Sequence, residues 1–319
     1  MVVLSYFLIT HLPSFYSVSS FVVMKECILL VSYIGFSKVK TFLFLHPMNQ
    51  LEISVIVSTY NAEEWLEKVL WGFEIQTYQN FELIIADDGS GPKTKALLDD
   101  LSQKLRCPIV HVWQEDEGFQ KSRILNKALQ ACRGRYVVMT DGDCIPRPDF
   151  LQVHYSRRKP GHFLSGGYFM LPMTTSKRIQ IADITNSRCF NYSWLKENGV
   201  LPSRKNLKLI ASGKFEDFLN RITPTKATWN GHNASGWLSD ILEVNGFDER
   251  MQYGGQDREL GERLMNKGIK GIQIRYSAIC IHLDHKRGYK TPESLRKNRA
   301  IRDETIRSKS TFTPFGIRS

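Results

Sequence analysis

The sequence predicts the α/β fold class, with a mostly parallel central sheet flanked by helices. From Ile53 onward, short runs rich in β-branched residues alternate with longer stretches of helical periodicity. This alternation is typical of parallel strands covered by helices. Several of the apolar runs end in acidic or glycine-containing turns. The chain has 319 residues, 42% hydrophobic and 24% charged, which is the composition of a globular protein able to bury a sizeable core.

The first half of the α/β region has the clearest pattern. Residues 53–58 form a predicted buried strand. Asn61 is the predicted N-cap of the helix that follows, because Glu64 stands three positions later, as in a capping box. Further strands are predicted at 81–86, 109–113 and 135–140, and further helices at 93–105 and 121–132.

The second half changes rhythm, so its elements are less sharply defined by pattern. The small residues of 230–237 suit a loop in which backbone lies close to a ligand. The other predicted elements are a strand or hairpin at 163–173, a polar helical insert at 174–226, a helix starting near Ser239, a helix at 253–267 and a last strand at 269–281.

Three regions are predicted along the chain: a leader of uncertain status (1–47), one α/β domain (48–285) and a basic tail (286–319). The leader consists of broken apolar runs, none of which reaches the ~20 residues that a spanning helix needs. No basic segment precedes its first run, as it would in a secretory signal. It is either a weak membrane anchor or upstream sequence translated from an early start codon. The second interpretation is preferred because Met48 directly precedes a clean strand, and it predicts that a protein starting at Met48 folds and is active.

The net charge of +11 is concentrated near the C-terminus, where residues 286–319 hold ten lysines and arginines against three acidic residues. Such a segment is either a solvated basic helix face or a surface attracted to anionic lipid headgroups or an acidic glycan. No nucleic-acid-binding motif accompanies the charge, so nucleic acid is not an expected partner. The six cysteines are scattered without a CxxC pair, which favours reduced thiols and a reducing compartment.

The most informative motif is Asp141-Gly142-Asp143, which directly follows the apolar run 136–140. Open α/β sheets bind ligands at the carboxyl ends of their strands. Two carboxylates there suit a divalent cation that also holds a diphosphate. Because roughly one Asp-x-Asp is expected by chance in a chain of this length, the surrounding motifs must decide between this interpretation and an ordinary acidic loop.

Polar groups at two other predicted element ends are candidates for nucleotide binding. Thr59, Tyr60 and Asn61 end the first strand and offer an aromatic face and polar tips to a base and a ribose. The alternative for these three is a capped turn with a packed tyrosine. Arg123, on the helix predicted at 121–132, either reaches a diphosphate or faces solvent.

Four segments stand in an order that resembles a family 2 glycosyltransferase of the GT-A fold. They are residues 54–61, Asp87-Asp88-Gly89-Ser90, Asp141-Gly142-Asp143 and Gly254-Gly255-Gln256-Asp257. Residues 236–264 also resemble the C-terminal segment shared by galactosyltransferases and chondroitin-polymerase-type enzymes. The resemblance covers about residues 51–285 and implies a GT-A, Rossmann-like sheet in a single catalytic domain.

The resemblance implies a role for each acidic residue. Asp88 is expected to accept the imide N–H of uracil. Asp143 is expected to ligate Mn²⁺ or Mg²⁺ directly, and Asp141 to help hold the ribose, with Gly142 between them. Asp257 is the expected general base, which takes the proton of the acceptor hydroxyl. Without the resemblance, Asp88 would be an ordinary turn residue and Asp257 a helix-capping one.

Histidines near the end of the last strand are candidates for the metal shell. His282 is the first candidate and His285 the rival, and a structural role remains open for both. The chain departs from the common family pattern at Tyr253 and Gln256, where tryptophan and glutamate are more usual. Because Gln256 is not an acid, the departure puts the sugar preference in doubt more than the chemistry.

The expected function is that of a metal-dependent, inverting glycosyltransferase that uses a nucleotide-sugar donor, with UDP as the expected nucleotide. The expected acceptor is a glycan or lipid-linked oligosaccharide in surface polysaccharide synthesis. The expected location is the cytoplasm, with peripheral attachment to the inner face of the plasma membrane through the basic tail. The sequence does not predict the donor sugar, the acceptor hydroxyl or the linkage.

Two other function classes stay open. A sugar nucleotidyltransferase also has an α/β sheet with metal-binding carboxylates, but it is expected to carry a glycine-rich, lysine-containing phosphate loop after its first strand. Thr59-Tyr60-Asn61-Ala62 is not such a loop. A non-catalytic adaptor for a glycan or a membrane would need only the fold and the tail, and it would release no UDP from any donor.

Overall fold

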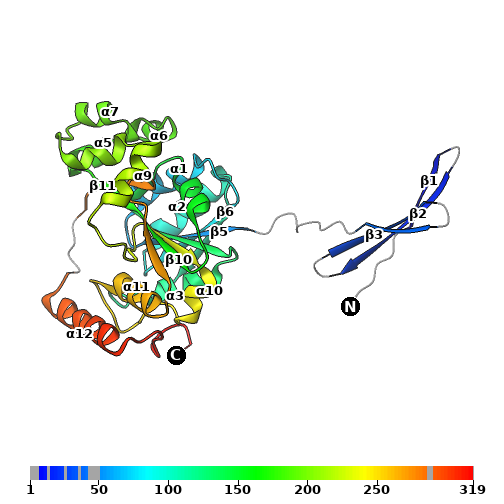
Figure 1. Ribbon diagram of the computed structural model, residues 1–319. Helices are drawn as coiled ribbons and strands as arrows, with labels where there is room; N and C mark the ends of the chain where they lie inside the picture. The colour runs from blue at the N-terminus through cyan, green and yellow to red at the C-terminus, as the bar shows by residue number, and fades with distance from the viewer. Residues whose placement is uncertain are drawn as a thin grey trace. The chain divides into compact units, whose positions relative to one another are not determined.

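The computed structural model describes residues 7–12, 15–24, 27–34, 37–41, 51–285 and 290–318, which belong to two compact units, 1–50 and 51–319 (Figure 1). In the first unit the described residues form an antiparallel sheet with the strand order β1-β2-β3-β4. Its strands are β1 (Phe7–Leu12), β2 (Phe15–Met24), β3 (Cys27–Ile34) and β4 (Ser37–Thr41). Of the helices in the described residues, none has the length and apolar character needed to cross a bilayer.

The second unit is organised around a large, mostly parallel sheet, as predicted. Within the described residues its strand order is β13-β10-β12-β8-β5-β6-β7. Only β12 runs antiparallel to its neighbours, β8 and β10. The strands are β5 (Ile53–Thr59), β6 (Phe81–Asp87), β7 (Ile109–Trp113), β8 (Tyr136–Asp141), β10 (His162–Ser165), β12 (Ala234–Trp237) and β13 (Lys270–Gln273).

Helices cover both faces of this sheet because its central strands are apolar on both sides. Side chains alternate between the faces of a strand. Val55 and Val57 of β5 therefore pack in the same cluster as residues of α1, whereas Ile56 packs in a second cluster with residues of α3. The helices of this half are α1 (Glu63–Glu74), α2 (Pro92–Lys104), α3 (Lys121–Ala131) and α4 (Phe150–Arg157).

The predicted cap of α1 is wrong. The N-cap is Ala62, and within the described residues it makes no side-chain capping bond. Asn61 instead has a left-handed backbone, with φ of 44°. Its N–H donates to Ser90 Oγ at 2.8 Å, and its Oδ1 accepts the Gly91 N–H at 3.0 Å. Asn61 therefore joins the loop after β5 to the loop after β6, a long-range contact that a local capping pattern does not show.

Two predicted segments, one a strand or hairpin and one a strand, are each divided between two sheets. The segments predicted at 163–173 and 269–281 contribute β10 and β13 to the large sheet. Their second halves, β11 (Gly167–Met170) and β14 (Ile279–His282), join β9 (Cys144–Pro146) in a small sheet of order β11-β14-β9. The crossing at Gly166 is tight, since a Cβ there would lie 2.0 Å from Asn233 Oδ1. Close packing against Asn233 therefore separates the two strands here. The periodic pattern of apolar residues in the sequence gives no sign of it.

A buried histidine holds β12 in this arrangement. His154 Nε2 lies 3.0 Å from Asn233 Oδ1, and its Nδ1 lies 2.7 Å from Ser235 Oγ. Asn233 Nδ2 donates to the carbonyls of Gly167 and Ala278, which fixes its Oδ1 as the acceptor of an Nε2–H. Burial lowers the pKa of His154 to about 4, so the ring is neutral at pH 7.

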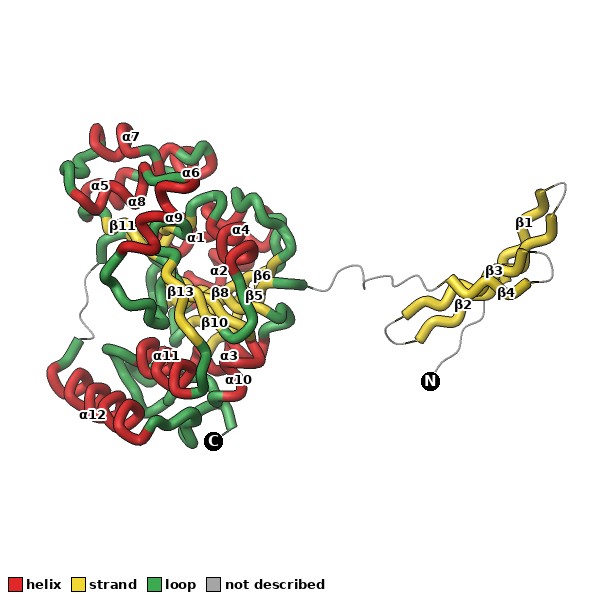
Figure 2. The backbone as a smooth tube through the Cα atoms, viewed as in Figure 1, coloured by secondary structure: helices red, strands yellow, loops and turns green. Residues whose placement is uncertain are grey.

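The predicted insert is helical in the structure and forms a group of short helices (Figure 2). It contains α5 (Met173–Arg178), α6 (Ile181–Thr185), η1 (Arg188–Phe190), α7 (Tyr192–Glu197), η2 (Arg204–Asn206), α8 (Leu207–Ile210) and α9 (Gly213–Ile222).

The predicted basic tail is part of the α/β unit rather than a separate region. Thr291 caps the helix α12 (Pro292–Ser308) by accepting the Ser294 N–H, and α12 packs on α11 (Gln256–Asn266). Beyond it, Thr313 donates its hydroxyl to Asp248 Oδ2 at 2.8 Å. The second unit begins at Leu51, and the predicted start at Met48 lies outside the described residues. The remaining helix, α10, is Leu238–Glu243.

Candidate active site

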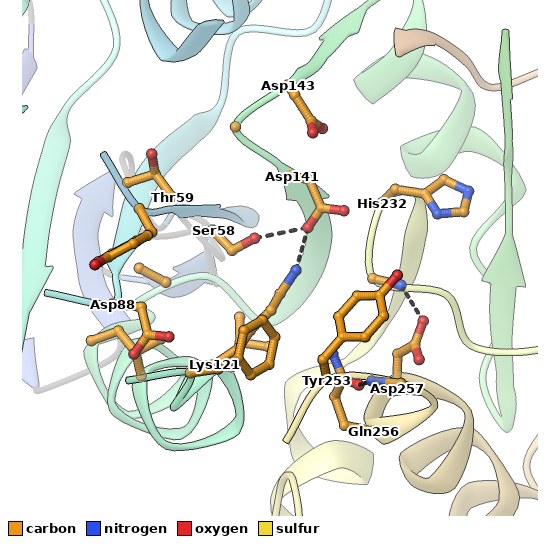
Figure 3. Close-up of a pocket in the computed structure, with 18 of the residues that line it drawn as sticks. Ser58, Thr59, Asp88, Lys121, Asp141, Asp143, His232, Tyr253, Gln256 and Asp257 are labelled. Atoms are coloured by element: carbon orange, nitrogen blue, oxygen red, sulfur yellow. Dashed lines mark hydrogen bonds and ion pairs between the residues drawn. The ribbon is translucent and has the colours of Figure 1, made fainter. Parts of the chain in front are cut away.

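A cavity of about 1460 Å³ opens at the carboxyl ends of β5, β6 and β8. It brings together every predicted site residue except Arg123, from segments that are far apart in the sequence. Figure 3 shows Thr59 and Asp88 on one side and Asp257 on the other, with Asp141 and Lys121 between them. The predicted residues that line it are Thr59, Tyr60, Asn61, Asp88, Asp141, Gly142, Asp143, Asp257 and His282.

Asp141 is held by two donors at the end of β8. Lys121 Nζ lies 2.6 Å from its Oδ1, and Ser58 Oγ donates to the same oxygen at 2.7 Å. Burial alone would raise the pKa of Asp141, but the Lys121 ammonium lowers it well below the usual range. Burial would conversely lower the pKa of Lys121, and the carboxylate raises it instead. Both groups are therefore charged at neutral pH.

Gly142 is required by the close approach of β5. Its N–H donates to the Ser58 carbonyl at 2.7 Å. A Cβ at this position would lie 2.9 Å from that same oxygen, which is closer than real Cβ contacts. The two carboxylates can thus stand one residue apart at this sheet edge only if a residue without a side chain separates them.

Asp143 points towards two histidines, one that ends β14 and one that follows it. Its Oδ1 lies 3.8 Å from His282 Nε2, and its Oδ2 lies 3.0 Å from His285 Nε2. His282 Nδ1 lies 2.8 Å from the Leu283 carbonyl. Because that carbonyl can only accept, Nδ1 carries the ring proton in the neutral ring and Nε2 presents a lone pair towards Asp143.

These groups fit a hard divalent cation. Asp143, Cys144 and His282 each place a ligand atom within 4.8 Å of the others. The Cys144 side chain is fully buried, and burial raises its pKa well above the usual value, so a neutral thiol stands there. Carboxylate oxygen and imidazole nitrogen suit Mn²⁺, whereas a buried thiol does not. Asp143 and His282 are therefore the stronger pair of ligands, with His285 within reach.

The end of β5 supplies an unsatisfied hydroxyl and an exposed ring. Thr59 Oγ1 is buried and has no hydrogen-bond partner among the described residues, although it lines the cavity. Buried polar groups without partners are uncommon in native proteins, so this one favours a ligand. Tyr60 is 49% exposed and donates its hydroxyl to Asp116 at 2.8 Å, which leaves its ring available for stacking.

Asp88 is fixed beneath the cavity by two donors. Gln114 Nε2 donates to its Oδ1 at 2.7 Å, and the Gln120 N–H donates to its Oδ2 at 2.9 Å. Burial raises the pKa of Asp88 above its usual value, and these two hydrogen bonds oppose that shift. Each carboxylate oxygen can accept a further hydrogen bond, so the group can still bind the N–H of a base.

Arg123 does not line the cavity. Its Nη1 lies 2.5 Å from Glu117 Oε2 in a largely exposed ion pair. Lys121, two residues earlier, lines the cavity instead. The sequence carried a signal for this difference. Lys121 falls at helical spacing with the apolar residues Ile124, Leu125 and Ala128 and so shares their buried face, whereas Arg123 lies off that stripe.

Asp257 lies in the first turn of α11, across the cavity from Thr59. Its Oδ2 accepts the Gly231 N–H at 2.9 Å, and its Oδ1 accepts the Arg258 N–H at 3.0 Å. Gly255, the N-cap, has φ of 89°, a conformation that few residues other than glycine adopt. The glycines of this turn therefore aim the carboxylate into the cavity.

His232 is a cavity residue that the sequence did not single out, although its loop was expected near a ligand. Its ring packs nearly perpendicular to the Tyr168 ring, with 4.6 Å between the centroids. Burial lowers the pKa of His232 to about 4, so the ring is neutral and available for hydrogen bonding. The signal was weak, because a single histidine in a loop is more often structural.

The helix α12 forms part of the cavity wall, which the sequence did not predict. Leu295, Arg299, Arg302 and Asp303 line the cavity. A Cβ on Gly254 would lie 2.5 Å from the Leu295 side chain, so the turn before Asp257 fits closely against α12. The segment predicted as a tail thus supports the turn that carries the candidate base.

Residues 54–163 match the family described as "Glycosyl transferase family 2". The chain carries a family 2 glycosyltransferase domain. The match includes Thr59, Asp88, Asp141 and Asp143 but ends before Asp257. The predicted family is therefore confirmed, while the roles of single residues stay predictions.

Named relatives extend the similarity beyond the matched segment of this glycosyltransferase domain. The chain is 22% identical over 282 residues to "Uncharacterized glycosyltransferase YfnE" of Bacillus subtilis, covering 78% of this chain and 69% of that protein. It is 25% identical over 234 residues to the chondroitin synthase of Escherichia coli, covering 70% of this chain but only 34% of that protein. The predicted similarity to chondroitin-polymerase-type enzymes is thus confirmed.

Solved structures show that the glycosyltransferase domain has the GT-A fold. The mannosyltransferase PcManGT of Pyrobaculum calidifontis, in complex with GDP-Man and Mn²⁺, is 18% identical with a TM-score of 0.51, covering 81% of this chain and 70% of that one. TarS 1-349 of S. aureus, in complex with UDP-GlcNAc, is 16% identical with a TM-score of 0.54, covering 81% and 69%. At these identities the likeness concerns the fold alone.

Proposed function

We propose that this protein is an inverting glycosyltransferase that moves a sugar from a UDP-linked donor to a hydroxyl of a glycan or lipid-linked acceptor, in surface polysaccharide synthesis. The observation that carries the proposal is the convergence of Asp88, Asp143 and Asp257 on one cavity. They come from the end of β6, the end of β8 and the start of α11.

The donor side of the cavity comprises Thr59, Tyr60, Asp88, Lys121, Asp141 and Asp143. The orphaned Thr59 hydroxyl and the half-exposed Tyr60 ring suit a nucleoside. Asp88 accepts the imide N–H of uracil. Lys121 adds a positive charge beside the diphosphate, although its pairing with Asp141 partly neutralises that charge.

Asp143 and His282 would hold Mn²⁺ or Mg²⁺, with His285 beside them. Two structural neighbours are complexes with nucleotide sugars, and one of them also contains Mn²⁺, which supports a metal-dependent nucleotide-sugar transferase. When bound, the cation would act as a Lewis acid that stabilises the diphosphate as a leaving group.

The acceptor side comprises Gly231, His232, Asp257, Arg258 and Arg299. We assign Asp257 as the general base. As the acceptor oxygen attacks the anomeric carbon, its proton passes to an Asp257 carboxylate oxygen, and the bond from that carbon to the diphosphate oxygen breaks. Attack from the face opposite the leaving group inverts the configuration. The Gly231 and Arg258 N–H groups hold the carboxylate in place.

The cavity is large enough for both substrates. Ligand pockets for small molecules usually have volumes of about 300–1,000 Å³, and this cavity holds about 1460 Å³. The excess leaves room for an acceptor beside the donor. A cytoplasmic location, at the inner face of the plasma membrane, belongs to the same proposal.

A donor screen tests the activity. UDP release is measured with UDP-glucose, UDP-galactose and their N-acetyl forms in the presence of Mn²⁺. We expect release from one of these donors to exceed the rest and to depend on the cation. A non-catalytic adaptor would release UDP from none of them, and that outcome would overturn the proposal.

Replacing Asp143 tests the metal assignment. We expect Asp143→Ala to lose the rise in melting temperature that UDP plus Mn²⁺ gives the parent protein, because a ligand stabilises only the state that binds it. Asp99→Ala, on the exposed face of α2, is the matched control and should keep the full rise. If Asp143→Ala were stabilised as much as the parent, the assignment would be wrong.

A further inference from the structure

The helix α9 carries its apolar side chains on its outward face. Phe215, Phe218 and Ile222 are 49%, 53% and 57% exposed. Their spacing of three and four residues places them on one face of the helix. Ile210, at the end of the preceding helix α8, is 56% exposed. An exposed apolar stripe of this kind marks an interaction site more often than chance.

The inward face of α9 is polar. Glu216 pairs with Arg157 at 3.1 Å and is only 14% exposed. Asn220, 8% exposed, donates to Ser277 Oγ at 2.8 Å and accepts the Tyr276 N–H at 2.9 Å. An ordinary surface helix buries its apolar stripe and exposes its polar one. The reversal on α9 means that its apolar stripe does not serve the core of this unit.

The stripe belongs to a basic segment of the chain. The insert, residues 174–226, contains ten lysines and arginines against four acidic residues. On α9 itself Lys214 and Arg221 are exposed, and neither has an ion pair within the described part of the chain. Both acidic residues of the helix are engaged by Arg157. The outward face therefore combines apolar side chains with uncompensated positive charge.

We propose that this α9 face docks on an anionic lipid bilayer. The face comprises Phe215, Phe218 and Ile222 together with Lys214 and Arg221. The apolar side chains enter the headgroup region while the two basic side chains contact lipid phosphates, as in interfacial amphipathic helices. A second copy of this chain fits less well, because it would bring its own net charge of +11 against the same surface.

The insert is joined to the candidate active site. Lys208 of α8 donates to the Tyr168 carbonyl at 2.8 Å, and Tyr168 lines the cavity next to His232 and His282. A docked insert would therefore hold the cavity near the bilayer, where a lipid-linked acceptor would stand. This consequence rests on the proposed function, whereas the docking itself does not.

Vesicle co-sedimentation of the full chain tests the docking. The parent protein is mixed with vesicles of phosphatidylcholine alone or of phosphatidylcholine with phosphatidylglycerol. We expect binding to the anionic vesicles, weakened by salt because screening reduces the attraction. The variant Phe215→Ser/Phe218→Ser/Ile222→Ser should bind at least about tenfold more weakly, since binding scales with the apolar area buried in the interface. Lys214→Glu/Arg221→Glu should lose the preference for anionic vesicles.

A matched variant separates the α9 face from general surface hydrophobicity. Met265→Ser/Ile306→Ser/Phe312→Ser removes three side chains of similar exposure, 41%, 50% and 42%, from the C-terminal region. It should bind anionic vesicles as the parent does. All variants should keep the parental melting temperature, because every replaced side chain is exposed.

Three outcomes would overturn the docking proposal. The parent protein would not sediment with anionic vesicles, or the α9 triple variant would sediment as well as the parent. Alternatively, analytical ultracentrifugation would find a dimer that the α9 triple variant alone abolishes, which would assign the face to a second copy. UDP release is measured separately, so a failure of the proposed function would not be mistaken for a failure of docking.

Discussion

The two sides of the cavity are built in different ways. The donor side comes from β5, β6, α3 and β8, which follow one another along the chain and meet at one sheet edge. The acceptor side comes from the loop before β12 and from α11 and α12, which are brought together by contacts between distant segments. The donor side is therefore a product of parallel topology, whereas the acceptor side depends on individual long-range contacts.

Asp257→Asn should have the largest effect on activity and should act on the acceptor side alone, because it removes the general base and leaves the donor side intact. General base catalysis contributes typically about 10²–10⁴-fold, so we expect kcat for sugar transfer to fall by about that factor. Asparagine can still accept the Gly231 N–H. UDP affinity, measured by calorimetry, should stay within about twofold, since uniform binding is not removed.

Asp99→Asn is the control for that substitution and should keep the parental kcat. If Asp257→Asn transferred sugar at the parental rate, the general base would lie elsewhere. If it instead lost UDP binding, the division into a donor side and an acceptor side would fail.

Protonation of His154 should weaken the acceptor side as pH falls. The pKa of His154 is lowered from 6.5 to about 4 by burial, so between these values the unfolded state binds the proton first. His154 should therefore lower the free energy of unfolding from about pH 6.5 downwards, by about 3 kcal/mol near pH 4. His232, whose pKa burial also lowers to about 4, adds to the slope in the same pH range. Urea denaturation at a series of pH values measures this slope.

His154→Gln should remove the His154 share of that slope and leave the share of His232, whatever its effect on stability at pH 7. His162→Gln is the matched control, because His162 lies near the surface and bonds the Pro160 carbonyl, and it should keep the parental slope. An unchanged slope in His154→Gln would show that other groups set the acid limit.

Lys121→Met should have the smallest effect of the three and should fall on the donor side. Asp141 would lose the ammonium at 2.6 Å while remaining three-quarters covered. Since breaking a partly buried pair leaves one charge uncompensated, we expect a loss of about 1–3 kcal/mol in the free energy of unfolding. UDP should bind roughly tenfold more weakly, and kcat should change less than in Asp257→Asn.

Lys121→Met/Asp141→Asn completes a double-mutant cycle on that pair. Its loss of stability should be smaller than the sum of the single losses, because each single change already breaks the interaction. If the loss of stability in the double variant equalled the sum of the two single losses, Lys121 and Asp141 would not interact in solution.

The donor side could be predicted from the sequence because each of its residues ends a local pattern. Thr59, Asp88 and Asp141 all follow or end runs of β-branched residues, and parallel strands deliver their carboxyl ends to one edge. One prediction on this side failed because a contact between strand ends overrode a local preference. Asn61 is the example, since it bonds Gly91 rather than capping α1.

The acceptor side could be predicted only in part. Helical periodicity indicates a basic helix near the C-terminus, but not that Leu295 meets the Gly254 turn. The breaks at Gly166 and after β13 are equally hidden, because they result from close packing between segments rather than from turn-forming runs. Packing between residues far apart in the chain cannot be predicted from the periodicity of a single sequence.

The antiparallel strand β12 has a consequence for how the chain reaches its native state. During synthesis β5, β6, β7 and β8 emerge before β12 and can assemble. One edge of the apolar strand β8 stays open until Ser235 arrives to pair with Val138. An open apolar strand edge is a template for intermolecular pairing, and long-range pairings form slowly. We therefore expect the nascent chain to be most prone to aggregation while the insert is being translated, and to benefit then from a chaperone that covers β8.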